Sequence, residues 1–188
     1  INKRIDAETK FLDFGCSDGA LTSYFDRQFG LEAYGVDKDE RSLKWGNLFS
    51  PSIKFCTDID DLPDLYFDVC TSIEVLEHIP PKQLSSVLSS LAHKIRKGGV
   101  LLGTVPSISS PVAEKHYQHF SCSGLNDLLE KEFSVEQIVS FARSNIKTRL
   151  IERLRQNRFF RIDSPILNNK LLDQYSKIST GELGSRLF

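Results

Sequence analysis

The architecture of this chain follows from one short sequence, Phe11-Leu12-Asp13-Phe14-Gly15-Cys16-Ser17-Asp18-Gly19. An apolar run that ends in an acidic turn, followed by a segment of helical periodicity, predicts a strand, a tight loop and a helix. Gly15 and Gly19 lack the Cβ that would hold a ligand away from the backbone, and Ser17 or Asp18 can cap the helix. The sequence therefore predicts a loop that holds a cofactor.

A second predicted strand, residues 31–37, ends in Asp37. Asp37 follows Asp13 at close to the spacing, about 20 residues, at which a carboxylate accepts the hydroxyls of a ribose in doubly wound sheets. After a third short strand, Asp58 and Ile59 are placed to meet the amino group and the ring of an adenine. A solvated acidic loop is the alternative for these two residues. Together the acids predict a nucleoside site at the carboxyl ends of parallel strands.

The rest of the chain alternates between strand and helix patterns. We expect further strands over residues 53–56, 66–72, 100–105 and 133–139, and helices over residues 39–48, 82–95 and 123–131. This order predicts an α/β fold, a three-layer Rossmann-like sandwich around a mainly parallel sheet of seven strands, or of six. Residues 1–140 form the expected cofactor-binding domain, and residues 141–188 a basic helical extension of the same domain.

Composition narrows the class of protein. The chain has 188 residues, of which 40% are hydrophobic and 26% charged, with a formal net charge of −1. These values indicate a single folded domain and argue against a general nucleic-acid binder. No signal peptide and no apolar run of about 18 residues is visible, so we expect a cytoplasmic protein. Four dispersed cysteines suggest neither disulfides nor a zinc ribbon. The chain begins at Ile1 without any methionine, so we expect residues to precede it.

On these motifs, residues 11–139 resemble the class I S-adenosylmethionine-dependent methyltransferases, in particular the type 11 and type 12 groups. The usual loop of that family is DxGxGxG, with Ser17 here in place of the middle glycine. Asp13 and Asp18 would repel a pyrophosphate but suit a sulfonium and an ammonium group. The resemblance implies that S-adenosylmethionine is bound by Asp13, Gly15, Cys16, Ser17, Gly19, Asp37, Lys38, Asp58, Ile59 and Ser72.

A second cluster follows the fourth predicted strand. If the chain turns helical from Glu74, then Glu77 and His78 share its face, which predicts a metal site or an acid–base cluster. This ExxEH pattern is similar to the metal motif of ubiquinone-pathway O-methyltransferases and small-RNA 2′-O-methyltransferases, which implies Mg²⁺ or Zn²⁺. A downstream histidine, His116 or His119, would complete it. The implied ligands are Glu74, Glu77, His78 and His119. His78 or His119 acting as a metal-free general base is the alternative, and a purely structural role is another.

The carboxyl-terminal part is strongly basic. Residues 143–161 contain many arginines against Glu152 alone, with an apolar stripe at helical spacing. This pattern predicts an amphipathic helix that contacts an anionic membrane or a phosphate-bearing acceptor, or one that simply packs on the sheet. The tail also resembles extensions of methyltransferases of bacterial surface-glycan synthesis, which implies a sugar acceptor, free or lipid-linked.

The sequence thus predicts a methyltransferase that modifies a hydroxyl oxygen of a small molecule, a sugar or a lipid-linked acceptor. No Asn-Pro-Pro-Tyr-like motif for amide recognition follows the fourth strand, which favours oxygen over nitrogen. RNA 2′-O-methylation through the ExxEH site is one alternative. A catalytically silent partner protein with the same fold is another.

Overall fold

The computed structural model describes residues 5–109, 112–141 and 186–187. The strands are β1 (Lys10–Phe14), β2 (Glu32–Val36), β3 (Lys54–Cys56), β4 (Phe67–Ile73), β5 (Ile95–Pro106), β6 (Ser140–Phe141) and β7 (Arg186–Leu187). The helices are α1 (Ala20–Phe29), α2 (Glu40–Phe49), α3 (Pro81–Lys94) and α4 (Cys122–Leu129), with short 3-10 turns η1 (Ile59–Asp61) and η2 (Leu76–His78).

The strands form one seven-stranded sheet in the order β3-β2-β1-β4-β5-β7-β6. The strands from β3 to β5 are parallel, and β7 runs antiparallel to both of its neighbours. In this register Asp13 at the end of β1 lies beside Gly35 on β2 and Thr71 on β4. The carboxyl ends of the central strands therefore meet at one edge, and the predicted α/β architecture is confirmed.

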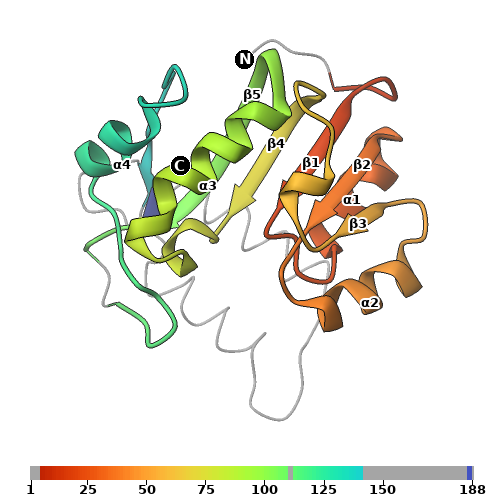
Figure 1. Cartoon of the computed structure of the whole chain (residues 1–188), viewed down its shortest axis with the longest axis horizontal. Coiled ribbons are helices and arrows are strands. Elements are labelled where there is room, and N and C mark those ends of the chain that lie inside the picture. The colour runs from red at the N-terminus through yellow and green to blue at the C-terminus, as the bar shows by residue number, and fades with distance from the viewer. Residues whose placement is uncertain (1–4, 110–111, 142–185, 188) are drawn as a thin grey trace.

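Helices cover both faces of the sheet. On one face Phe25 of α1 packs on Phe11 of β1, with ring centroids 5.4 Å apart, and Gly46 of α2 lies against Phe55. On the other face Leu91 of α3 belongs to the core beneath β1 and β4. Figure 1 shows α3 in front of β5 on this side. Apolar layers on both sides of the parallel strands explain why β4 is buried over nearly its whole length.

The predicted strand over residues 133–139 is wrong. These residues form no regular element, and the strand that follows is only Ser140–Phe141, paired with Arg186–Leu187. Phe133 and Ile138 pack against the buried clusters next to α3 and α4, so their apolar character reflects this packing and not pairing in the sheet. The basic helix predicted for residues 143–161 lies outside the described residues.

Two further findings concern the whole described part of the chain. All four cysteines are free thiols. None of the helices that the structure describes is both long enough and apolar enough to cross a membrane.

At the amino ends of β2 and β3, Glu32 anchors a polar cluster. One of its carboxylate oxygens, Oε1, accepts hydrogen bonds from Lys54 Nζ, Tyr34 Oη and Tyr66 Oη, each at 2.9 Å. These hydrogen bonds, that of Lys54 first, lower the pKa of Glu32 from an ordinary 4.5 to about 2. A lowered folded-state pKa stabilises the protein above the unfolded value, and this stabilisation is lost as the pH falls through the folded value.

We therefore expect Glu32→Gln to unfold at a lower urea concentration than the wild type at neutral pH. The difference in stability between the two proteins should narrow as the pH falls below about 4.5 towards 2. In this range Glu32 of the wild type binds a proton in the unfolded state but stays ionised in the folded state, which favours unfolding. Urea titrations at several pH values, with exposed Glu114→Gln as the control, measure this. A difference that does not change with pH would contradict the assignment.

Candidate functional site

The loop between β1 and α1 is tightly constrained. Gly15 and Gly19 have φ values of +80° and +73°, in the left-handed region that favours glycine. A Cβ on Gly15 would lie 2.3 Å from Val75 Cγ2, and one on Gly19 would lie 2.4 Å from Phe55 Cζ. The two glycines are therefore required by conformation and by packing, in addition to the ligand access that the sequence suggested.

Asp37 is tied directly to this loop. Its Oδ2 accepts a hydrogen bond from the backbone N–H of Ser17 at 2.7 Å, and its Oδ1 accepts one from Asp39 N–H at 2.9 Å. Ser17 itself has a φ of +52°, which explains why the family places a glycine there. Each carboxylate oxygen has a second lone pair, so Asp37 can still accept two ribose hydroxyls. The neighbouring Lys38 is exposed.

Asp13 does not point into solvent beside the loop. It is buried beneath it, where Thr22 Oγ1 donates to Oδ2 at 2.7 Å and Thr71 Oγ1 donates to Oδ1 at 2.8 Å. Burial raises the pKa of Asp13, and the negative charge of Asp37 adds to this effect. Asp13 thus joins β1, α1 and β4 behind the cofactor loop. Thr22 and Thr71 were not predicted as partners of Asp13, because no spacing pattern marks a partner on another element.

Cys16 lies in the same loop and is buried against Gly35. Burial raises the pKa of its thiol, and the charge of Asp13 raises it further. The group therefore stays protonated at neutral pH and is a packing residue rather than a nucleophile.

The remaining predicted cofactor residues line the same edge of the sheet. Asp58 follows β3 and caps η1, where its Oδ1 accepts from Asp60 N–H at 3.0 Å, and Ile59 packs against the core. Ser72 lies near the end of β4 and is 2% exposed. Within the described part of the chain its buried Oγ has no hydrogen-bond partner. An unsatisfied buried hydroxyl at this edge fits a bound polar ligand.

Glu74, Glu77 and His78 do not share a helical face, so that expectation is wrong. Glu74 has a φ of +57°, its N–H still bonds to Thr104 O of β5, and its Oε1 accepts from Thr104 Oγ1 at 3.0 Å. The helical turn begins only at Leu76. The potential metal ligands that the structure groups are instead Glu77, His78 and His116, with ligand atoms within 4.8 Å of one another.

The contacts of His78 define the roles of its two ring nitrogens. Its Nδ1 lies 3.0 Å from Lys115 O, and because a carbonyl oxygen only accepts, Nδ1 carries the hydrogen. In the neutral ring Nε2 is then the basic nitrogen, and it lies 3.9 Å from Oε1 of Glu77, a carboxylate that is fully buried. The ring also meets His116 edge to face, with centroids 4.7 Å apart. Glu77 therefore lies beside the basic nitrogen of His78, and His116 packs against the same ring.

His119 belongs to the same cluster through His116. His119 Nε2 lies 2.8 Å from His116 Nδ1, so one of the two rings donates a hydrogen bond to the other. The backbone N–H of Tyr117 donates to Glu77 O at 2.9 Å, which fixes this segment against η2. Of the two downstream histidines proposed from sequence, His116 lies in the group and His119 supports it.

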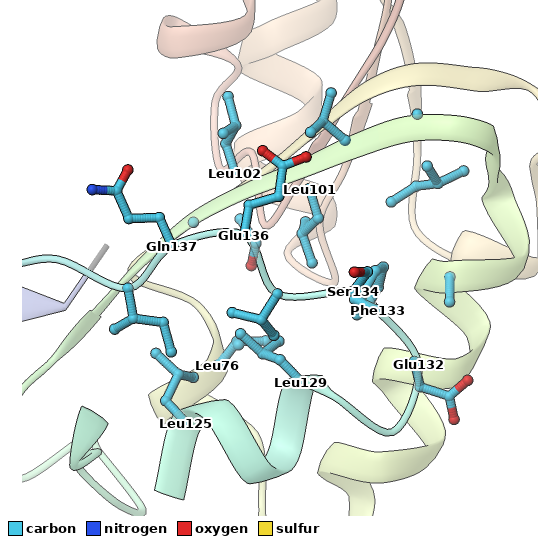
Figure 2. A pocket seen from close by; sticks show the side chains of 18 of the residues that line it. Leu76, Leu101, Leu102, Leu125, Leu129, Glu132, Phe133, Ser134, Glu136 and Gln137 are labelled. Carbon is cyan, nitrogen blue, oxygen red and sulfur yellow. The ribbon is translucent and has the colours of Figure 1, made fainter. Parts of the chain in front are cut away.

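A cavity of about 1260 Å³ lies along β5, away from the glycine loop. Figure 2 shows Leu76, Leu125 and Leu129 gathered at one side and Leu101 on the strand. Polar side chains such as Glu132 and Glu136 lie among the apolar ones. The lining includes Ser72 and Leu76, so the cavity reaches the end of β4 next to Glu77. No pattern in the sequence indicates this cavity, because its walls come from separate elements.

Comparison with known proteins decides the family. A family model described as a methyltransferase domain matches residues 2–165. The chain belongs to the S-adenosylmethionine-dependent methyltransferases. A crystal structure of such an enzyme from Archaeoglobus fulgidus superposes with a TM-score of 0.67 at 19% identity, covering 97% of this chain and 85% of that one. This likeness confirms the fold of the methyltransferase.

The curated relatives are longer proteins, and the chain matches only part of each. A ubiquinone biosynthesis O-methyltransferase of Idiomarina loihiensis is 34% identical over 98 residues, which cover 48% of this chain and 39% of that protein. A probable fatty acid methyltransferase of Mycobacterium tuberculosis is 29% identical over 106 residues, which cover 53% of this chain and 25% of that protein. The methyltransferase chain therefore spans less than half the length of these relatives. The predicted cofactor, S-adenosylmethionine, agrees with the family.

Proposed function

We propose that this methyltransferase transfers a methyl group to a hydroxyl oxygen of a lipid or lipid-linked acceptor. The observation that carries the proposal is the basic Nε2 of His78, held towards Glu77 because Nδ1 donates to Lys115 O. An imidazole fixed in one tautomer beside a buried carboxylate is an arrangement that removes protons.

Each residue of the cluster has a defined part in this reaction. Bound S-adenosylmethionine supplies an electrophilic methyl group on a sulfonium. His78 Nε2 accepts the proton of the acceptor hydroxyl, and the charge of Glu77 stabilises the imidazolium that forms. His116, hydrogen-bonded to His119, limits the rotation of the His78 ring by its edge-to-face contact. Alignment of acceptor and methyl group then provides much of the remaining rate enhancement.

The cofactor is assigned to the edge formed by β1, β2 and β4. In this proposal the loop from Gly15 to Gly19 holds its methionine part, Asp37 accepts its ribose hydroxyls, and Asp58 with Ile59 contacts its adenine. Ser72 Oγ, buried and without a partner among the described residues, is available to the same ligand.

The class of acceptor rests on the cavity along β5. Leucine, valine and isoleucine side chains of β5, of α4 and of residues 133–139 line much of its wall, and the cavity reaches Leu76 beside the Glu77–His78 turn. An acyl or prenyl chain suits such a lining better than a sugar or an RNA, because apolar walls offer few hydrogen bonds. The relative named as a probable fatty acid methyltransferase is consistent with this proposal.

A metal ion at the same cluster is a second candidate. Glu77, His78 and His116 offer one carboxylate and two imidazoles, a donor set that suits Zn²⁺. Mg²⁺ prefers oxygen ligands, and the second carboxylate expected from Glu74 is hydrogen-bonded to Thr104 instead. A bound Zn²⁺ would lower the pKa of the acceptor hydroxyl. His78 donates its other nitrogen to a backbone carbonyl, as metal-bound histidines commonly do.

The acceptor proposal is tested with methyl-labelled S-adenosylmethionine and three separate acceptors: a long-chain hydroxylated lipid, methyl glucoside and single-stranded RNA. We expect the label in a methyl ether of the lipid, identified by mass spectrometry, and none with Asp37→Ala. Transfer to RNA in preference to the lipid would overturn the lipid assignment. Cofactor binding without transfer to any acceptor would support a silent partner protein instead.

A further inference from the structure

Helix α2 carries an unusual outer surface. Trp45, Leu48 and Phe49 lie at i, i+3 and i+4, so they share one face, and they are 52%, 66% and 72% exposed. The rings of Trp45 and Phe49 stack with centroids 5.8 Å apart and an interplanar angle of 10°. The opposite face of the helix, with Leu43 and Gly46, is already buried on the protein. Helix α2 therefore has a second apolar face, besides the one that packs on the protein core.

Cations flank this apolar face. Arg41 is one helical turn before Trp45, and Lys44 is one turn before Leu48, so both lie beside the exposed rings, and both are exposed. The acids of the helix, Asp39 and Glu40, are confined to its first turn, where Asp39 caps the helix through Arg41 N–H at 3.1 Å. The surface formed by Arg41, Lys44, Trp45, Leu48 and Phe49, here the α2 surface, is thus aromatic and basic.

We propose that the α2 surface binds the headgroup region of an anionic phospholipid membrane. Tryptophan and phenylalanine with adjacent arginine and lysine are the residues by which interfacial helices insert a few ångströms into a bilayer and attract anionic lipids. This inference is independent of the acceptor and of the cluster at His78.

A second copy of the chain fits this surface less well. Stable protein interfaces bury about 800 Å² on each partner, more than the side chains of a single helical turn provide. A two-fold dimer through this surface would also bring Arg41 and Lys44 close to their own copies. Anionic headgroups, by contrast, pair with both cations while the rings enter the apolar layer.

The chain offers a direct probe, because Trp45 is its single tryptophan. We expect its fluorescence to shift to the blue, and its quenching by acrylamide to decrease, on addition of vesicles of phosphatidylglycerol and phosphatidylcholine. Brominated lipids should quench it. The basic residues 143–161 could carry the chain to vesicles by themselves, so sedimentation alone does not locate the contact, whereas Trp45 emission does.

Two sets of variants separate the apolar and the charged parts. Read by Trp45 emission, L48S together with F49S should raise the lipid concentration needed for the blue shift roughly tenfold, whereas R41Q together with K44Q should make the shift similar on vesicles with and without phosphatidylglycerol. Ile108→Ser, which removes another apolar side chain that is 65% exposed, is the control and should leave both unchanged. Unshifted Trp45 emission with both vesicle types, or a blue shift that depends only on protein concentration, would overturn the proposal.

Discussion

Gly15→Ala is expected to lower the affinity for S-adenosylmethionine by more than tenfold and to destabilise the fold. Gly15 has a φ of +80°, and a non-glycine residue held in such a conformation costs about 1–3 kcal/mol. The added Cβ would also lie 2.3 Å and 2.8 Å from the two Cγ methyls of Val75, so the chain at the cofactor edge must shift. Calorimetric titration of the cofactor and urea unfolding measure the two effects.

Two controls separate the cost of the positive φ from the steric clash with Val75. Gly30→Ala also places alanine at a positive φ, +66°, but its Cβ would meet only Ala7 Cβ at 3.9 Å. It should therefore show the conformational cost without the loss of cofactor binding. In the double variant Gly15→Ala with Val75→Ala, both colliding methyls are gone, and binding should recover in part. If Gly15→Ala binds the cofactor as tightly as the wild type does, the close contact of Gly15 with Val75 is not needed for cofactor binding, and the prediction is wrong.

Local signals made the amino-terminal half predictable. The Asp13 loop, α1 and Asp37 were placed correctly because strand, turn and helix patterns lie within one short segment, and parallel pairing brings Asp13 beside Gly35. The partners of Asp13 were not found, because Thr22 and Thr71 are ordinary threonines until the fold brings them within 2.8 Å of its carboxylate.

Two predicted elements, the helix from Glu74 and the strand over residues 133–139, are wrong because contacts with distant segments outweigh the local sequence pattern. Glu74 suits a helix by spacing, yet its backbone continues the pairing of β4 with Thr104, and it turns at a positive φ. Residues 133–139 contain the aromatic and β-branched side chains of a strand, but Phe133 and Ile138 are half-buried against neighbouring clusters, and strand pairing begins only at Ser140. In both cases the deciding partner is on another segment, which no local pattern reveals.

His78→Gln is expected to lower kcat for the lipid hydroxyl by about 10²–10⁴-fold, the usual contribution of a general base. Glutamine can still contact Lys115 O, but it has no nitrogen that accepts a proton at neutral pH. The affinity for S-adenosylhomocysteine should not change, because His78 lies outside the Asp37 and glycine-loop contacts. His93→Gln is the matched control, since His93 is exposed on α3, where its Nδ1 hydrogen-bonds to Ser89 O away from the Glu77 cluster.

The same series distinguishes a base from a metal ligand. If His78 acts as a base, His116→Gln should reduce kcat far less than His78→Gln, because His116 packs edge to face on the His78 ring and does not itself take the proton. A Zn²⁺ site would instead make both variants equally inactive and the wild type sensitive to chelators, since Glu77, His78 and His116 would then each supply one ligand. Full activity of His78→Gln would exclude both roles, and the proton would have to leave by another route.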